Sequence, residues 1–139
     1  MTKNIESKLE MLDLFFSDYS MKYNKKPGNK EINTSFKIKY AEKKDDKNQV
    51  RIQIETDIKD DQDCLQLNLT TLGFFRLNRE NMDDEMATAI LRKNTVAIMF
   101  PFIRSQVSLL TTQPGMTPIM LQPIDINALV DNGEEETNE

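Results

Sequence analysis

Residues 50–59 alternate apolar and polar side chains along VRIQIETDIK, and this pattern limits the fold more than any other feature of the sequence. A period of two predicts a β-strand with one apolar and one polar face. Other alternating runs lie at about residues 12–23, 32–40 and 65–69, separated by turns rich in lysine and aspartate. The first half of the chain therefore predicts a four-stranded antiparallel sheet, ordered as a meander. Its apolar face needs a covering layer.

Two positions interrupt this alternation. Phe15, Tyr19 and Tyr23 share one parity, whereas the upstream apolar residues, ending at Phe16, have the opposite parity. Such a phase change predicts a β-bulge, or a long strand that serves two different neighbours. Gly73 follows the last alternating run and predicts a bend in the chain.

The stretch 94–128 supplies the cover. It is apolar, carries only two charged residues and contains four of the five prolines. Asn94 or Thr95 is suited to cap a long helix. Pro101 is compatible only with a first turn, so this helix either begins near Met99 or kinks there. Its predicted apolar stripe consists of Phe100, Ile103, Val107 and Leu110.

Shorter elements flank this helix. The acidic turn 83–85 predicts a short separate helix upstream, since carboxylates favour a helix N-terminus. Residues 113–115 (QPG) end the long helix, and the prolines within 116–123 exclude regular structure there. Asp125 is suited to cap a final helix that reaches about Val130. We therefore expect an α+β fold.

Length and composition limit the class of protein. At 139 residues, one domain is expected over residues 1–130, followed by a disordered acidic tail over 131–139. A single cysteine excludes an intrachain disulfide and favours a reducing compartment. The N-terminus has no apolar signal core, and the longest apolar run is far shorter than the ~20 residues of a membrane span. We expect a cytoplasmic protein with no membrane insertion.

The charged residues argue against nucleic acid as a partner. The chain has 23 acidic and 18 basic residues and a net charge of −5, whereas phosphate binding needs a basic face. The densest basic cluster, Lys25, Lys26 and Lys30, flanks Pro27 and Gly28. A solvated turn is the favoured interpretation of this cluster.

Catalysis is disfavoured for chemical reasons. The chain has no histidine, so it lacks an imidazole base or metal ligand. Cys64 follows a run of aspartates, which should raise its pKa rather than activate the thiol. The aspartates resemble a loose calcium loop without its required glycine and glutamate, so we predict a solvated turn and neither a metal nor a cofactor. They are Asp57, Asp60, Asp61 and Asp63.

Three segments of the second half resemble the C-terminal half of SecB, the bacterial export chaperone. They are 100–104 (FPFIR), 113–118 (QPGMTP) and 121–129 (LQPIDINAL). The segment 73–75 (GFF) is similar to the end of the family's fourth strand, and the order of four strands followed by a helix agrees over nearly the whole chain. This resemblance implies a sheet covered by one long helix and assembled as a dimer of dimers, a homotetramer.

The resemblance also implies a function. SecB-like proteins are ATP-independent holdases that bind unfolded preproteins in hydrophobic grooves and pass them to the motor SecA. Methionine-rich surfaces suit such varied clients. Leu67, Leu69 and Thr71 match positions implicated in tetramer assembly. The groove implied for this chain consists of Ile32, Phe36, Ile38, Tyr40, Met116, Ile119, Leu121, Ile124, Ile126 and Leu129.

The chain departs from the family at the surface that docks SecA. Asp18 matches one acidic docking position, but Lys22 and Asn68 stand at two others. The last helix is also shorter than the family's. SecB-like proteins include dedicated chaperones of antitoxins in toxin–antitoxin systems. Two functions therefore remain open, namely a general holdase for export and a chaperone that binds one fixed partner.

Overall fold

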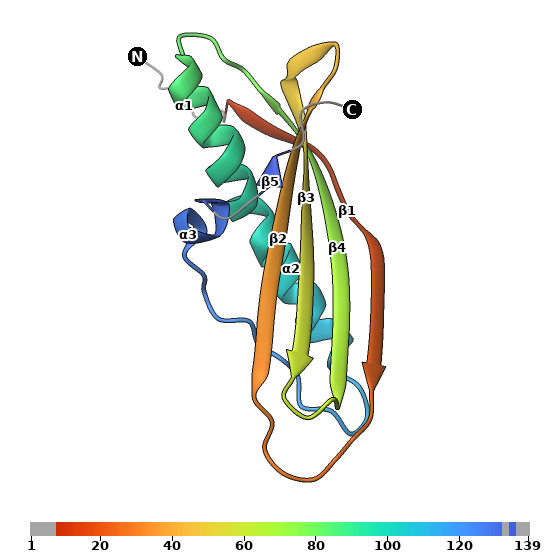
Figure 1. Cartoon of the computed structure of the whole chain (residues 1–139). Coiled ribbons are helices and arrows are strands. Elements are labelled where there is room, and N and C mark those ends of the chain that lie inside the picture. The colour runs from red at the N-terminus through yellow and green to blue at the C-terminus, as the bar shows by residue number, and fades with distance from the viewer. Residues whose placement is uncertain (1–7, 132–133, 136–139) are drawn as a thin grey trace, which may run out of the picture.

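The computed structural model describes residues 8–131 and 134–135, in which a twisted antiparallel sheet is covered on one face by a long helix (Figure 1). This arrangement confirms the predicted sheet and its covering helix. The strands are β1 (Leu9–Tyr23), β2 (Ile32–Lys43), β3 (Asp46–Asp60), β4 (Leu65–Leu77) and β5 (Glu134–Glu135). The helical elements are α1 (Asp84–Ala89), a π-helical turn (Ile90–Asn94), α2 (Thr95–Leu110) and α3 (Ile126–Asp131).

The strand order is β1-β4-β3-β2-β5, so the predicted meander is wrong for the first strand. Strands β2, β3 and β4 form hairpins, but β1 pairs with β4. The connection 24–31 is too long for a tight hairpin and passes around the β3–β4 turn instead. Asn24 N donates to Cys64 O over 2.7 Å, and Asp61 N donates to Glu31 O over 3.1 Å. These bonds hold the connection across the end of the sheet.

The predicted phase change in β1 is confirmed. Its pairing with β4 shifts register between Met11 and Asp13 and again between Phe16 and Asp18. Between the two shifts, Phe15 pairs with Leu72 on the outer face of the sheet, where its ring stacks on that of Phe74 at 6.0 Å. Tyr19 pairs with the buried Leu69 and lies on the helix-covered face. The expectation that Phe15 and Tyr19 share a face is therefore wrong.

The predicted pair of helices is a single continuous helix from α1 to α2. It begins as expected at Asp83, whose carboxylate accepts a hydrogen bond from Met86 N over 2.7 Å. Asn94 has helical backbone angles and makes no capping bond, so the chain does not restart there. Pro101 lies inside α2 instead of in a first turn. Continuity is favoured because Leu91 and the first residues of α2 are buried in the core. The predicted stripe is buried at Phe100, Ile103 and Val107 and partly buried at Leu110.

The π-helical turn inside this helix has specific partners. Tyr40 of β2 donates its hydroxyl to the carbonyl of Arg92 over 3.1 Å, and the Arg92 guanidinium lies over the Tyr40 ring at 5.1 Å. Thr95 donates its hydroxyl to Leu91 O over 2.6 Å. Side chains thus satisfy two carbonyls of the irregular turn, which explains why the helix continues through it.

Gly73 marks a close contact instead of the predicted bend. Strand β4 continues through it to Leu77. A Cβ atom at Gly73 would lie 2.8 Å from the sulfur of Met99 on α2 and 2.9 Å from the Phe75 ring. The glycine therefore allows the helix to pack closely on the sheet.

The C-terminal segment returns along the sheet from the end of α2. The capping role of Asp125 is confirmed, because its carboxylate accepts bonds from Asn127 N and Ala128 N over 3.0 and 3.3 Å. Of the predicted tail 131–139, Asp131 belongs to α3, and the backbone of Glu134–Glu135 pairs in parallel with Lys39–Tyr40. Residues 132–133 and 136–139 lie outside the described residues.

Gly73→Val should destabilise the protein by about 1–3 kcal/mol, because the new methyl groups collide with the buried Met99 and Phe75. Urea denaturation measures this change. Thr70→Val is the matched control, since it adds a valine to the same strand on the opposite face. Equal stability of the two variants would contradict the close contact.

Candidate functional site

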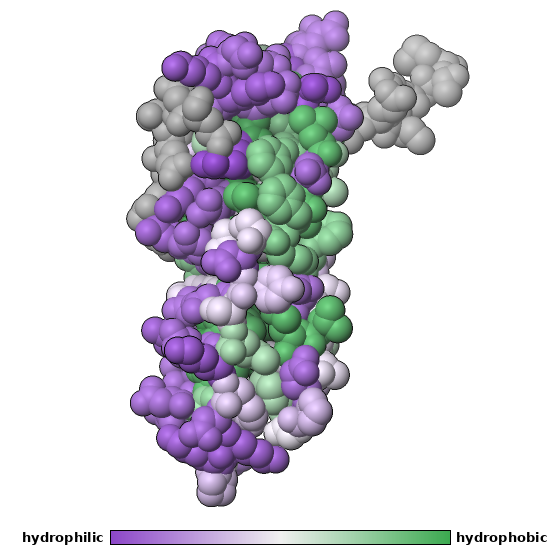
Figure 2. All heavy atoms as spheres, turned by 90° about the vertical axis from the view of Figure 1, so that its right-hand side faces the viewer, coloured by the Kyte–Doolittle hydropathy of each residue, from purple (hydrophilic) through white to green (hydrophobic). Residues whose placement is uncertain are grey.

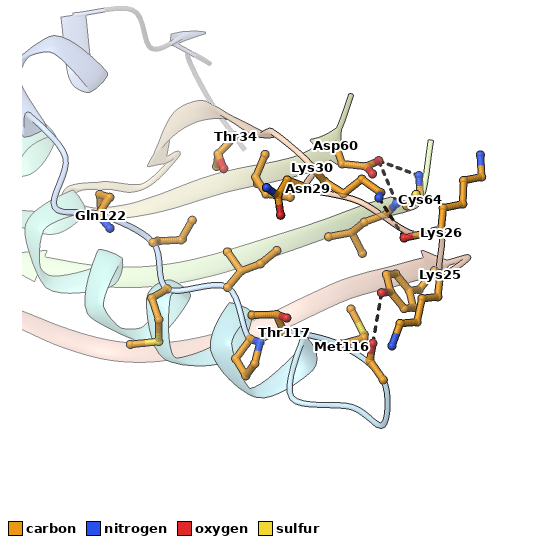
Figure 3. Close-up of a pocket in the computed structure, with 18 of the residues that line it drawn as sticks. Lys25, Lys26, Asn29, Lys30, Thr34, Asp60, Cys64, Met116, Thr117 and Gln122 are labelled. Atoms are coloured by element: carbon orange, nitrogen blue, oxygen red, sulfur yellow. Dashed lines mark hydrogen bonds between the residues drawn. The ribbon is translucent and has the colours of Figure 1, made fainter. Parts of the chain in front are cut away.

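A groove of about 900 Å³ opens at the lower end of the sheet in Figure 1. Its walls are the linker that follows α2, the first half of β2 and the β1–β2 connection (Figure 3). Six of the ten groove residues predicted from the sequence line it together. They are Ile32, Phe36, Met116, Ile119, Leu121 and Ile124.

A buried threonine positions the linker wall. Thr111 follows α2, and its hydroxyl donates to Val107 O over 2.8 Å. The same oxygen accepts a hydrogen bond from the backbone N–H of Ile119 over 2.8 Å. One hydroxyl thus joins the helix to the middle of the linker. Closer to the helix, Tyr23 of β1 makes a longer contact, 3.4 Å, to the carbonyl of Gly115.

Strand β2 forms the opposite wall because its helix-facing side chains become more exposed toward its beginning. Ile38 is fully buried, Phe36 is half-buried, and Ile32 is 42% exposed. The Phe36 ring meets Phe100 of α2 edge to face at 5.7 Å between centroids. The helix therefore covers the later half of β2 and leaves its first residues open to the groove.

The other four predicted groove residues lie elsewhere. Ile38 and Tyr40 are buried under the helix. Ile126 and Leu129 belong to α3 and pack half-buried against the core. Alternation assigns β2 side chains to a face, but it does not indicate where along the strand the helix stops covering that face. The groove positions were implied by the resemblance to SecB, which does not show where this cover ends either.

The residues matched to assembly and docking lie on opposite faces of the sheet. Leu67, Leu69 and Thr71 are buried in the core of this chain, at no more than 1% exposure. Asp18 is exposed on the outer face of β1, opposite Thr70. Lys22 and Asn68 occupy the same outer face through their pairings with Gln66 and Ser20.

Sequence reasoning missed the basic side of the groove. Lys25, Lys26 and Lys30, interpreted as a solvated turn, line one end of it (Figure 3). The Lys30 ammonium donates to three carbonyls of its own loop, those of Lys26, Pro27 and Gly28, over 2.8–3.0 Å. One feature of the sequence could have indicated that these lysines do more than form a turn. The connection 24–31 is longer than a hairpin turn.

Asp60 and Cys64 lie at the base of the same end. Burial alone would raise the pKa of Asp60, but hydrogen bonds to its carboxylate from the backbone of Leu65 and Cys64 lower it below its ordinary value. Burial, a hydrogen bond with Asp60 and the nearby Asp60 charge raise the pKa of the Cys64 thiol. The predicted direction for Cys64 is confirmed, and the thiol is protonated at neutral pH.

The arrangement is suited to binding and offers little for catalysis. Its apolar walls surround an open groove, and its buried carboxylate is engaged by backbone N–H groups. Within residues 8–131 and 134–135, no three metal-ligating side chains are grouped to hold an ion. No helix in this part of the chain has the length and apolar character that crossing a membrane requires.

Thr111→Val should lower stability by about 1–3 kcal/mol, because the Ile119 N–H loses its acceptor. The Ile119 amide should also lose more protection against hydrogen exchange than the core amides of β3, because the core amides lose only what the fall in global stability removes. Hydrogen exchange measures both. Thr112→Val is the control, since among the described residues its exposed hydroxyl bonds only to Ser108 O, at the end of the helix. Unchanged exchange at Ile119 would contradict this anchoring role.

Comparison with known proteins identifies relatives of this chain. A family model described as preprotein translocase subunit SecB matches residues 3–137. The chain is 33% identical over 119 residues to an uncharacterized protein of Methanocaldococcus jannaschii, covering 85% of this chain and 65% of that protein. It is 36% identical over 67 residues to the protein-export protein SecB of Neisseria meningitidis, covering 48% of this chain and 44% of that protein. The chain thus spans less than two thirds of the length of either relative.

The fold has a counterpart among solved structures. A SecB-like chaperone of Mycobacterium tuberculosis, solved in complex with a peptide from an antitoxin, superimposes with a TM-score of 0.69 at 16% identity. The match covers 85% of this chain and 88% of that one. Because the family model extends over nearly the whole sequence, this chain belongs to the SecB family.

Proposed function

We propose that this protein is a chaperone that holds unfolded polypeptide segments in the groove between the linker and β2. The observation that carries the proposal is the open groove of about 900 Å³ with apolar walls from both sides. The SecB family is a family of chaperones and not of enzymes, which agrees with the lack of a catalytic pattern in the sequence.

The linker supplies adaptable apolar contacts. Met116 and Met120 lie on the groove, and unbranched methionine side chains repack readily around different partners. Ile119, Leu121 and Ile124 provide the remaining apolar surface of this wall. Many weak contacts of this kind suit a client without a defined sequence, because burial of apolar area is non-directional.

Strand β2 offers a second mode of capture. Along the edge that faces away from β3, the only strand that pairs with β2 within the described residues is β5, at Lys39 and Tyr40. Its earlier residues, from Ile32 to Phe36, adjoin the groove. An extended client can add a strand along this part of the edge while its side chains enter the groove. Passive binding of this kind needs neither ATP nor a cofactor.

The preferred clients in this proposal are preproteins that await export by the Sec translocase. The protein would then act in the cytoplasm, with SecA as a partner. Family membership and similarity to export SecB proteins support this proposal.

A second candidate is a dedicated chaperone of one fixed partner, such as an antitoxin. It is favoured by Lys22 and Asn68 on the outer face of β1 and β4, where acidic side chains are expected for SecA docking. The solved chaperone of similar fold also binds an antitoxin peptide. Suppressed aggregation of several unrelated clients and co-purification with SecA support export, whereas binding of one peptide sequence without SecA supports the second candidate.

Replacing Leu121 and Ile124 together by aspartate should abolish suppression of client aggregation and leave the sheet folded. Both side chains line the groove on the irregular linker, outside the helix and strands. Light scattering of an aggregating client at increasing chaperone ratios measures the effect, with circular dichroism as the check of folding. Leu109→Asp is the control, since Leu109 is 65% exposed on α2 and lies outside the groove. Wild-type suppression by the double variant would refute the groove assignment.

We also propose that the chain assembles into a homotetramer. Strand β1 lies at the edge of the sheet and exposes large apolar side chains. Figure 2 views the molecule from this side and shows an apolar surface between hydrophilic ends. An exposed apolar edge strand favours association. The exposed residues of β1 are Met11, Leu12, Phe15, Tyr19 and Tyr23.

At micromolar concentration, multi-angle light scattering should give four times the chain mass of 16.1 kDa. Phe15→Lys should reduce the assembled fraction, because it places a charge in the apolar surface of β1. Ser20→Lys on the same strand is the control. A monomeric mass for the wild type would exclude this assembly.

A further inference from the structure

The groove carries a charge opposite to that of the protein. Its lining residues include three lysines but a single carboxylate, that of Asp60. The lysines are Lys25, Lys26 and Lys30. The whole chain, by contrast, has a net charge of −5. The three lysines come from the β1–β2 connection and lie at one end of the groove, away from Gln122 (Figure 3).

Two of these lysines and the carboxylate are already engaged. Lys30 holds three carbonyls of its own loop, and Lys26 donates to the carbonyl of Gln62 over 3.0 Å. Asp60 is 7% exposed and accepts bonds from two backbone N–H groups. These contacts to neutral carbonyls fix the basic end in place.

Lys25 differs from its neighbours. Its side chain lies along Gly115, with its Cδ and Nζ atoms each 3.9 Å from the position of a Cβ at that glycine. Within the described residues, its ammonium makes no hydrogen bond or ion pair. Lys25 therefore presents an uncompensated cation where the apolar linker wall begins.

We propose that the groove prefers peptide segments in which an apolar run is flanked by an aspartate or glutamate, whose carboxylate pairs with Lys25. This proposal rests on the proposed function and names the chemistry of the client. The apolar run fills the surface from Met116 to Ile124, and the flanking carboxylate meets the basic end. Apolar walls on both sides of the groove favour a peptide over a nucleic acid as the source of negative charge.

The test uses three fluorescein-labelled peptides with one apolar core, flanked at both ends by glutamates, glutamines or lysines. Fluorescence anisotropy measures their binding to the full-length wild type, to Lys25→Glu and to Lys44→Glu. Lys44 lies in the β2–β3 turn at the opposite end of the sheet and outside the groove, so it controls for the same change in net charge.

The wild type should bind the glutamate-flanked peptide about tenfold more tightly than the lysine-flanked one, since attraction replaces repulsion at a partly exposed pair. Lys25→Glu should remove or reverse this preference, Lys25→Gln should reduce it, and Lys44→Glu should preserve it within about twofold. The preference should shrink at about 1 M salt, because the screening length falls to about 3 Å. Thermal melts of the variants establish that they fold.

The outcomes separate the two proposals. Equal binding of all three peptides by the wild type overturns the charge preference and leaves the groove function in place. Binding of none of them overturns the proposed function and the preference with it. An equal loss of preference in Lys44→Glu overturns the assignment to Lys25. A labelled oligothymidylate serves as the nucleic-acid probe. If it binds more tightly than any peptide and this binding is lost in Lys25→Glu, the proposal that the ligand is a peptide is overturned.

Discussion

The contact of Met99 with Gly73 sets the distance between the helix and the sheet, and the groove depends on that distance. Without a side chain at Gly73, α2 lies close enough for Val96 and Ile103 to be fully buried. Close packing of this kind leaves few voids where the two layers meet. The helix crosses the later part of β2 at this spacing, so Ile32 and Phe36 at its beginning remain available. The groove is thus the part of the apolar face that the helix does not cover.

The strands and the apolar stripe of the helix were predictable because each is encoded locally. Alternation identified β3 and the helix-facing residues of β4, and parity located the bulge in β1. The position of β1 beside β4 was not predictable, because the length of the connection 24–31 argues against a tight hairpin but does not indicate which strand β1 joins. Pro101 and Asn94 also suggested a helix start, but burial against the sheet outweighs local preference there.

The candidate site was predictable on the linker side and less so on the other walls. The resemblance to SecB implied that Met116, Leu121 and Ile124 belong to the groove, and the prolines of the linker agree with this because they exclude regular structure there. The basic end brings together the connection 24–31 and Gly115, which are far apart in sequence. The composition of the whole chain indicates a negative charge, which is opposite to the positive charge of this end of the groove. A local basic end on an acidic chain emerges only when topology is known.

The hydrogen bonds of Thr111 separate the stability of the groove from that of the core. The sheet and the helix bury their apolar side chains together, whereas one hydroxyl ties the middle of the linker to the helix. Segments held by few buried contacts open locally at a lower free energy than global unfolding. Met116, Ile119 and Leu121 are only partly buried against the core, so we expect the linker to open at a lower free energy than the core. Such opening would widen the groove, so bulky and slender segments would bind the same protein in different native substates.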